Sequence, residues 1–171
     1  VGLYHDRVRG EGTFERLEKN VAECGHPALC ANMAINTLNV DSVEAAIKYV
    51  NDSPYFKMIS LNFHTPFPGT EYLALDREKR GEIIDLIISY KKKGYPIMNS
   101  VTGLKYMRDL KFKKACWMSN FVFTDETRCA QCVGSLSDGC KNCGFCMAGE
   151  ERAIMNLAPD TVLAGLKLRV K

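Results

Sequence analysis

Long apolar segments are missing from this sequence, and no signal-peptide pattern is found at its start. Its longest apolar runs are short and interrupted by charged residues, so none is long enough to cross a membrane. A strong charge of either sign is also missing. The net charge is only +3, which argues against nucleic acid or an anionic membrane as a partner. These absences predict a cytoplasmic protein without a membrane span.

The length of 171 residues excludes a complete large barrel but allows one well-cored domain with a small appendage. The composition, with 46% apolar and 25% charged residues, is that of an ordinary globular protein. The sequence begins at Val1 rather than at a methionine, which indicates a truncated or excised piece.

Cysteine is abundant and unevenly placed, with five of the eight cysteines inside residues 129–146. They form overlapping Cys-x-x-Cys pairs, and thiolates at this spacing on a tight loop can converge on one soft metal ion or cluster. A reducing cytoplasm disfavours the alternative, a disulfide framework. The isolated Cys24 and Cys30 are expected to pack in the core. The candidate metal ligands are Cys116, Cys129, Cys132, Cys140, Cys143 and Cys146.

The apolar pattern predicts helices that alternate with strands over the first hundred residues, after a loop at 1–12. The predicted elements are helix 13–24, strand 30–38, a helix capped by Asp41, strand 57–63, helix 76–93 ended by Gly94, a short strand 96–98 and a short helix capped by Ser100. The predicted inner faces of the last three helices carry Val43, Ala46, Ile47 and Val50; Ile83, Ile84, Ile87 and Ile88; and Leu104, Met107 and Leu110.

This alternation is typical of right-handed βαβ units, so the predicted fold class is α/β, with a parallel sheet covered by helices. Ligands of such sheets bind beyond the carboxyl ends of the strands. Asn36 and Asn39 close the first predicted strand, and His64 and Thr65 follow the second. These four residues therefore form the candidate active face.

The pattern changes after Leu110. Aromatic residues and a turn-forming Asp125 predict a β-hairpin that joins Cys116 to Cys129. The cysteine loop follows, and then one or two helices within 150–171, with Asp160 as a predicted cap. We therefore predict two domains, residues 1–110 and residues 111–171.

Three short motifs occur in order along the first forty residues. They are His5-Asp6-x-x-Arg9, Gly12-Thr13-Phe14 and Asn36-x-x-Asn39. This ordered set resembles the second half of the barrel of radical S-adenosylmethionine (SAM) enzymes. The cysteine-rich tail resembles the SPASM or twitch extensions of that superfamily, which hold auxiliary [4Fe–4S] clusters. The resemblance implies a partial parallel (β/α) barrel followed by a small cluster-binding domain of hairpin, loop and helix.

The resemblance also implies roles for three residues in binding SAM. Arg9 would hold the methionyl carboxylate with its forked guanidinium. Asn36 would reach the ribose or its surroundings, and His64 would contact cofactor or substrate unless it is a structural histidine. Enzymes of this kind cleave SAM to a 5′-deoxyadenosyl radical that modifies a small-molecule or peptide substrate, with an electron from a donor such as a ferredoxin or flavodoxin. No catalytic residue is assigned.

The sequence departs from the family pattern in two places. The Cys-x-x-x-Cys-x-x-Cys motif that binds the SAM-cleaving cluster is missing from these 171 residues. We therefore expect the chain to lack the amino-terminal half of the barrel and to be inactive alone. In the tail, Asp125-Glu126-Thr127 stands where the family has a turn glycine. The first candidate ligand quartet, with neighbouring sets of four as alternatives, is Cys116, Cys129, Cys143 and Cys146.

Two other functions fit the residues. Cys129/Cys132 and Cys140/Cys143 could close a tetrahedral zinc site that only folds the tail, as in a structural or interaction module without catalysis. This interpretation leaves Cys146 unexplained, which favours iron–sulfur. The third hypothesis is a binding protein that uses the barrel part as a scaffold.

Overall fold

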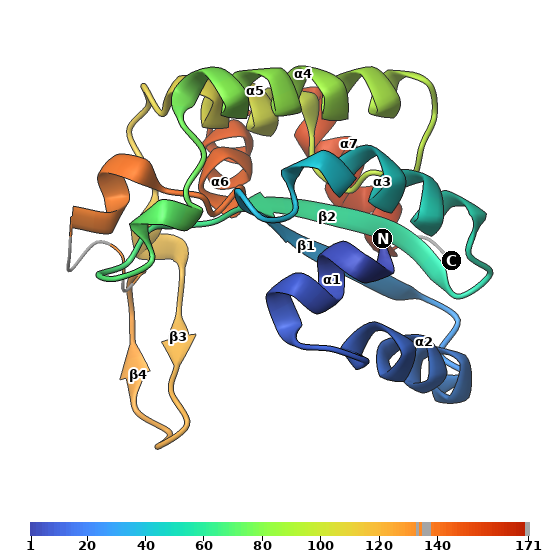
Figure 1. The fold of residues 1–171 in the computed structure, drawn as a ribbon. Coiled ribbons are helices and arrows are strands. Elements are labelled where there is room, and N and C mark those ends of the chain that lie inside the picture. The colour runs from blue at the N-terminus through green and yellow to red at the C-terminus, as the bar shows by residue number, and fades with distance from the viewer. Residues whose placement is uncertain (133, 135–137, 170–171) are drawn as a thin grey trace.

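The computed structural model describes residues 1–132, 134 and 138–169, and it is a mixed α/β arrangement around a small parallel sheet (Figure 1). The α-helices are α1 (Gly2–Arg9), α2 (Thr13–Cys24), α3 (Val43–Asp52), α4 (Arg77–Lys92), α5 (Val101–Asp109), α6 (Met147–Met155) and α7 (Pro159–Arg169). The strands are β1 (Leu29–Ile35), β2 (Phe56–Phe63), β3 (Phe121–Val122) and β4 (Arg128–Cys129). Within the described ranges, no helix combines the length and the apolar character that crossing a membrane requires.

β1 and β2 form the parallel sheet, and their pairing ends with Ile35 opposite Phe63. Helices precede, connect and follow these strands, as the alternating pattern predicted, so the α/β class is confirmed. In the part of the chain that the structure describes, the sheet does not close on itself. The barrel origin therefore stays a proposal.

The third strand, predicted at 96–98, is reduced to a single parallel bridge between Ile59 and Ile97. The cause is the side chain of Asn99, next to the bridge. Its Oδ1 accepts the N–H of Leu61 at 2.8 Å, and its Nδ2 donates to the carbonyl of Leu61 at 3.0 Å. A side-chain amide thus makes the bonds that a longer strand would make with its backbone.

The core lies between the sheet and helices α3, α4 and α5 (Figure 1). The predicted inner faces of α3 and α4 are confirmed as buried, because residues three and four apart share one face of a helix. Leu110 differs from the prediction: it ends α5 in a left-handed conformation (φ 58°) instead of lying on its inner face. Among the largest fully buried side chains are Ile35, Ile47, Ile59, Leu61, Ile84, Ile87, Leu104 and Met107.

The loop predicted for residues 1–12 is wrong for most of its length, because α1 occupies Gly2–Arg9. Residues 1–12 contain three glycines, a composition that favours a loop, but two of these glycines stand at the ends of the helix and not in its interior. Gly2 is its first residue, and Gly10 follows its last residue with φ 102°, a backbone conformation that suits glycine. Glycine weakens a helix mainly from an interior position, so this composition is compatible with a short helix.

The predicted helix caps have mixed outcomes. Ser100 caps α5 as predicted, since its Oγ accepts the N–H of Gly103 at 2.8 Å. Gly94 follows α4 with φ 93°, as expected of a residue that ends a helix. The predicted cap at Asp41 is wrong, because this residue lies in a short 3₁₀ turn, Val40–Ser42, and the residue before α3 makes no side-chain cap bond.

Asp160 caps a different helix from the one predicted. It lies in the first turn of α7, but its carboxylate accepts the N–H and the hydroxyl of Thr102, each at 2.8 Å, at the start of α5. α6 packs on α5 at two glycines: a Cβ on Gly149 would lie 2.4 Å from the carbonyl oxygen of Gly103. The tail helices are therefore fixed on α5 by close backbone contact and by capping.

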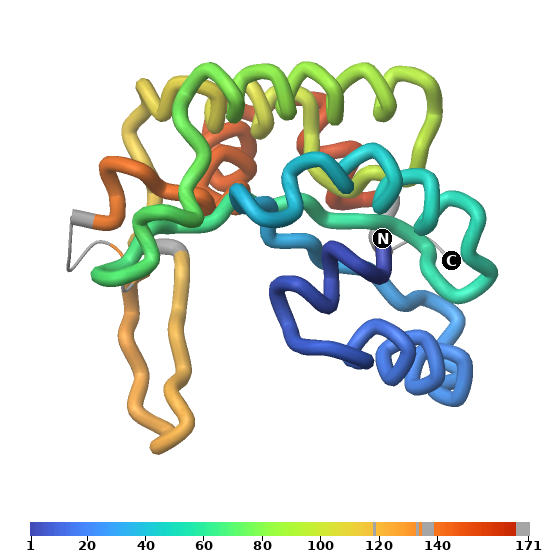
Figure 2. Tube along the Cα trace, in the orientation of Figure 1, coloured from blue at the N-terminus to red at the C-terminus, as the bar shows by residue number. Residues whose placement is uncertain are grey.

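β3 and β4 form the predicted hairpin, with Phe121 opposite Cys129. Its trace extends away from the helices (Figure 2). In the turn, the Asp125 carboxylate accepts the N–H of Thr127 at 3.1 Å, and Glu126 takes φ 66°. Glu126 thus adopts the left-handed conformation for which the resemblance expected a glycine.

Candidate functional site

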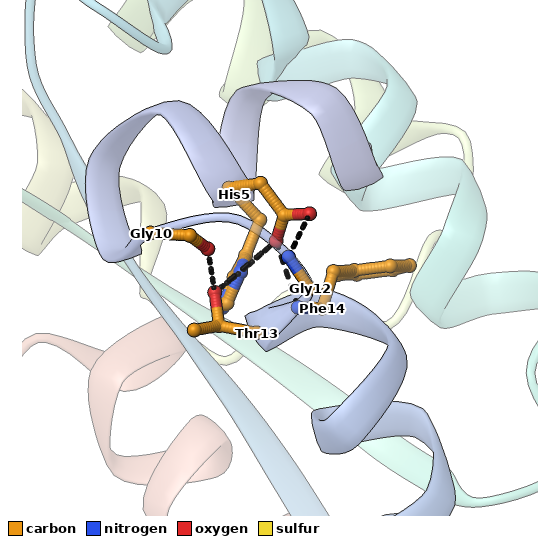
Figure 3. Close-up of polar contacts among 6 residues, drawn as sticks. His5, Gly10, Gly12, Thr13 and Phe14 are labelled. Carbon is orange, nitrogen blue, oxygen red and sulfur yellow. Dashed lines mark hydrogen bonds and ion pairs between the residues drawn. The ribbon is translucent and has the colours of Figure 1, made fainter.

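The amino-terminal motif folds as one unit around Asp6, whose carboxylate lies at the start of α2. Figure 3 shows how close His5, Gly12, Thr13 and Phe14 lie to one another in this unit. It accepts the N–H of Phe14 at 2.8 Å, the N–H of Gly12 at 3.0 Å and the hydroxyl of Thr13 at 3.1 Å. The bond from Phe14 makes the largest contribution to lowering the pKa of Asp6 below its ordinary value. The His5 Nδ1 lies 3.2 Å from the same Thr13 hydroxyl. These contacts hold α1 against α2.

A cavity of about 370 Å³ lies between α1, α2, β1 and α3. Arg9, Asn36 and His64, which the resemblance implicates in SAM binding, all line it, although they come from three separate segments. The structure therefore brings these three residues together near the carboxyl ends of β1 and β2. The other residues that line the cavity include His5, Asn39, Leu17, Met33, Tyr49 and Phe56.

Hydrogen bonds fix the polar residues of this cavity. The Asn39 Oδ1 accepts the N–H of Asn36 at 2.8 Å, and its Nδ2 donates to the carbonyl of Ala34 at 3.0 Å. The chain turns around the Asn39 amide, and β1 therefore ends earlier than predicted. The His64 Nε2 lies 3.1 Å from the hydroxyl of Thr70. Asn39 and His64 thus have a structural role in addition to their place on the cavity wall.

The cysteine loop is docked on the carboxyl end of β2. The N–H of Phe63 donates to the carbonyl of Gly144 at 2.8 Å, and the N–H of Gly144 donates to the Thr65 hydroxyl at 2.9 Å. The N–H of Cys146 donates to the Asn62 Oδ1 at 2.9 Å. A Cβ at position 144 would lie 2.0 Å from the carbonyl oxygen of Phe63, so only glycine fits here. Thr65, expected on the active face, holds this loop.

Three of the six candidate metal ligands gather beside the docked loop. Cys116, Cys132 and Cys143 line a second cavity, of about 320 Å³, together with Glu151. The N–H of Cys132 donates to the carbonyl of Cys116 at 3.0 Å. Burial raises the pKa of Cys116 to about 11, and negative charge on Cys132, Cys140 or Cys143 would add to this rise. The Cys140 thiol donates to the carbonyl of Gly134 at 3.2 Å and does not line this cavity.

Like Cys140, the last two candidate ligands do not line this cavity. Cys129 is half-buried on β4, opposite Phe121 in the hairpin. Cys146 is 1% exposed, and burial raises the pKa of its thiol. The structure thus places three candidates on the wall of one cavity and leaves Cys129, Cys140 and Cys146 outside its lining.

The gathered thiols are not in ligand geometry. Among the described residues, no three histidine, cysteine or acidic side chains form a group that could hold a metal ion. All eight cysteines are described, and all are free of disulfides. The donor chemistry still fits a soft metal, because several thiols surround one cavity. A metal would have to draw these thiols together and displace their protons, as happens where metal binding is coupled to folding.

The remaining two cysteines, Cys24 and Cys30, were expected in the core, and this expectation is wrong because both are exposed. Cys24 ends α2, which has no fully buried residue. Cys30 lies on β1, where exposed and partly buried residues alternate, and its side chain is on the exposed face. Both lie on elements far along the chain from the cysteine loop.

Arg80 carries no predicted role, although it touches the cysteine loop. Its Nη1 donates to the carbonyl of Cys143 at 3.0 Å, and only 4% of the residue is exposed. One pattern in the sequence could have predicted that Arg80 lies on the buried face of its helix. Arg80 precedes Ile83 and Ile84 by three and four residues, which is the spacing of a shared helix face.

We predict that Gly144→Ala displaces the cysteine loop, because the added Cβ would overlap the carbonyl of Phe63. The expected loss is about 1–3 kcal/mol of unfolding free energy in urea, with faster reaction of Cys143 and Cys146 with a thiol reagent. Gly165→Ala, on α7, is the matched control because nothing lies within 4 Å of its added Cβ. Equal stability and equal thiol reactivity of the two variants would contradict the docking.

We predict that Asp6→Asn weakens the cap of α2 in a pH-dependent way. The pKa of Asp6 is lowered in the folded protein, so its carboxylate stabilises the fold above its unfolded pKa, and this stabilisation is lost as the pH falls through the folded value. Thermal unfolding should therefore separate wild type from Asp6→Asn near neutral pH and not in strong acid. Asp41→Asn, at an exposed carboxylate, is the control. A difference that persists unchanged in acid would count against the cap.

Comparisons with known proteins identify no relative of this chain. The search of protein families, of curated proteins and of solved structures found no match to the chain. The functional argument therefore depends on the residues and on their arrangement.

Proposed function

We propose that this chain is part of a radical SAM enzyme, in which the first cavity binds SAM and the cysteine-rich tail holds an auxiliary iron–sulfur cluster. The observation that carries this proposal is the convergence of Arg9, Asn36 and His64 on one cavity. Asn36 and His64 were expected together at the ends of two neighbouring strands, but the position of Arg9 beside them did not follow from the strand pattern.

The size and lining of the first cavity support a nucleoside-like ligand. Its volume of about 370 Å³ lies at the lower end of the range usual for small-molecule sites. Tyr49 and Phe56 provide aromatic surface, and Arg9 provides a forked cation suited to a carboxylate. A ligand with one flat apolar part and one carboxylate, such as SAM, matches this combination.

The second cavity supports a metal centre held by thiolates. Cys116, Cys132 and Cys143 line this cavity, and Cys140 is the proposed fourth ligand, which gives one of the neighbouring sets allowed by the sequence. A bound [4Fe–4S] cluster would supply one-electron transfer. The residues of the chain itself hold the thiols, since the hydrogen bonds of Gly144 and Cys146 fix the loop on β2.

The two proposed sites are connected at two consecutive residues that follow β2. His64 lines the first cavity, and the next residue, Thr65, accepts the N–H of Gly144 in the cysteine loop. An electron carrier in the tail would therefore sit beside the end of the strand that leads into the cofactor cavity. This adjacency favours a redox role for the metal over a zinc ion that only folds the tail.

We predict that the oxygen-free chain, reconstituted with ferrous iron and sulfide, retains about four iron and four sulfide ions per chain. Cys143→Ala should lose most of this iron, because its thiol lines the second cavity. The matched control, Cys30→Ala, removes an exposed thiol from β1 and should keep the iron. If the wild-type chain instead contained one zinc ion per chain and no sulfide, the assignment would change from an iron–sulfur cluster to a structural zinc site.

We predict that Arg9→Gln weakens SAM binding, measured by equilibrium dialysis, roughly tenfold or more, since a hydrogen bond between charged partners is lost. Arg16→Gln is the control. Arg16 is exposed on the neighbouring helix α2 and does not line the cavity. Equal affinity of the two variants for SAM would remove the assignment of Arg9.

A further inference from the structure

Arg80 is a buried cation, which is costly to accommodate. It lies in the first turn of α4, with only 4% of its surface exposed. Moving a guanidinium out of water carries a large penalty unless an opposite charge or a full set of hydrogen bonds compensates for it. The surroundings of Arg80 should therefore contain a compensating negative charge.

The hydrogen bonds of Arg80 compensate for this penalty only in part. Its Nη1 donates to the carbonyl of Cys143 at 3.0 Å, and its guanidinium lies over the ring of Phe63, 5.2 Å from the centroid. Its Nε is buried, and within the described residues it has no hydrogen-bond partner. None of the ion pairs among those residues includes Arg80.

The thiols of the cysteine loop can supply negative charge here once a metal displaces their protons. Asp76 lines a cavity with Arg80, but its carboxylate already caps α4 by accepting the N–H of Lys79 at 2.7 Å. Burial lowers the pKa of Arg80, and negative charge on Cys146 and Cys143 would oppose this effect. Arg77, on the same helix, is exposed and adds a further positive charge. The buried cation thus lies against the cysteine loop, to which the hydrogen bond at the Cys143 carbonyl fixes it.

We infer that Arg80 is the buried counter-ion of the thiolate-bound cluster, holding the cysteine loop through Cys143 and raising the reduction potential of the centre. This inference rests on the proposed function. A cluster with four thiolate ligands is anionic, and reduction by one electron adds a further negative charge. Solvent and salt screen a buried cation only weakly, so it stabilises the reduced state more than the oxidised state.

The test compares Arg80→Met with Arg80→Lys in the reconstituted full chain. The midpoint potential is measured by mediated redox titration, with electron paramagnetic resonance of the reduced cluster as the readout. Arg80→Met, which removes the charge but keeps apolar volume, should shift the potential to a more negative value. Arg80→Lys should stay near the wild-type potential because it keeps the charge. Arg77→Met is the matched control, and its potential should be unchanged because Arg77 is exposed.

The outcomes separate this inference from the proposed function. An Arg80→Met chain that binds the cluster at the wild-type potential overturns the counter-ion role and leaves the proposed function standing. Loss of the cluster from Arg80→Met, with retention in Arg80→Lys, supports the role of the charge. Loss from both variants, when circular dichroism shows that both are folded, assigns Arg80 a hydrogen-bonding role and overturns the inference. A wild-type chain without iron and sulfide overturns the proposed function, and the counter-ion role with it.

If Arg80→Met does not fold, Arg80→Gln takes its place, because it also removes the charge but keeps hydrogen-bonding groups. A more negative potential in a folded Arg80→Gln chain, with a wild-type potential in Arg80→Lys, supports the counter-ion role. The wild-type potential in Arg80→Gln overturns it.

Discussion

The backbone contact between Gly144 and the end of β2 determines where the cysteine-rich tail lies. A side chain at position 144 would overlap the carbonyl of Phe63, so the fit depends on the backbone alone. Once this contact forms, Cys143 and Cys146 are buried on either side of it, and Cys143 reaches Arg80. A backbone overlap cannot be relieved by a change of rotamer, so close packing leaves this position little tolerance.

Two carboxylates of the tail bind the α/β layer at a second place, the start of α5. Glu150, on α6, accepts the N–H of Ser100 at 2.8 Å, and Asp160, on α7, accepts the N–H of Thr102 at the same end of α5. Carboxylates are favourable there because the first turn of a helix has free N–H groups and a partial positive charge. The domain boundary after residue 110 stays a prediction, but Ala148 of α6 belongs to the same hydrophobic core as the α/β layer.

The two candidate sites differ in whether their side chains are already in position without a ligand. The first cavity is held by hydrogen bonds that are complete within the chain, such as those of Asn39, so its shape does not need a ligand. The thiols around the second cavity are gathered but not in ligand geometry, so a metal would have to complete their arrangement. Arg80 connects the cysteine loop to α4 through the carbonyl of Cys143, and its buried Nε has no hydrogen-bond partner among the described residues.

Local pattern alone determined most of the elements: helices α2 and α4, the cap at Ser100, the hairpin and the buried faces of α3 and α4. These features depend on residues that are close in the chain, so periodicity and capping chemistry are enough to predict them. Only the tertiary structure decided that Asn99 shortens the third strand, that Asp160 caps α5 and that Arg80 meets the cysteine loop. Each of these contacts joins residues 38 to 63 positions apart, where the partner is set by packing and not by neighbouring sequence.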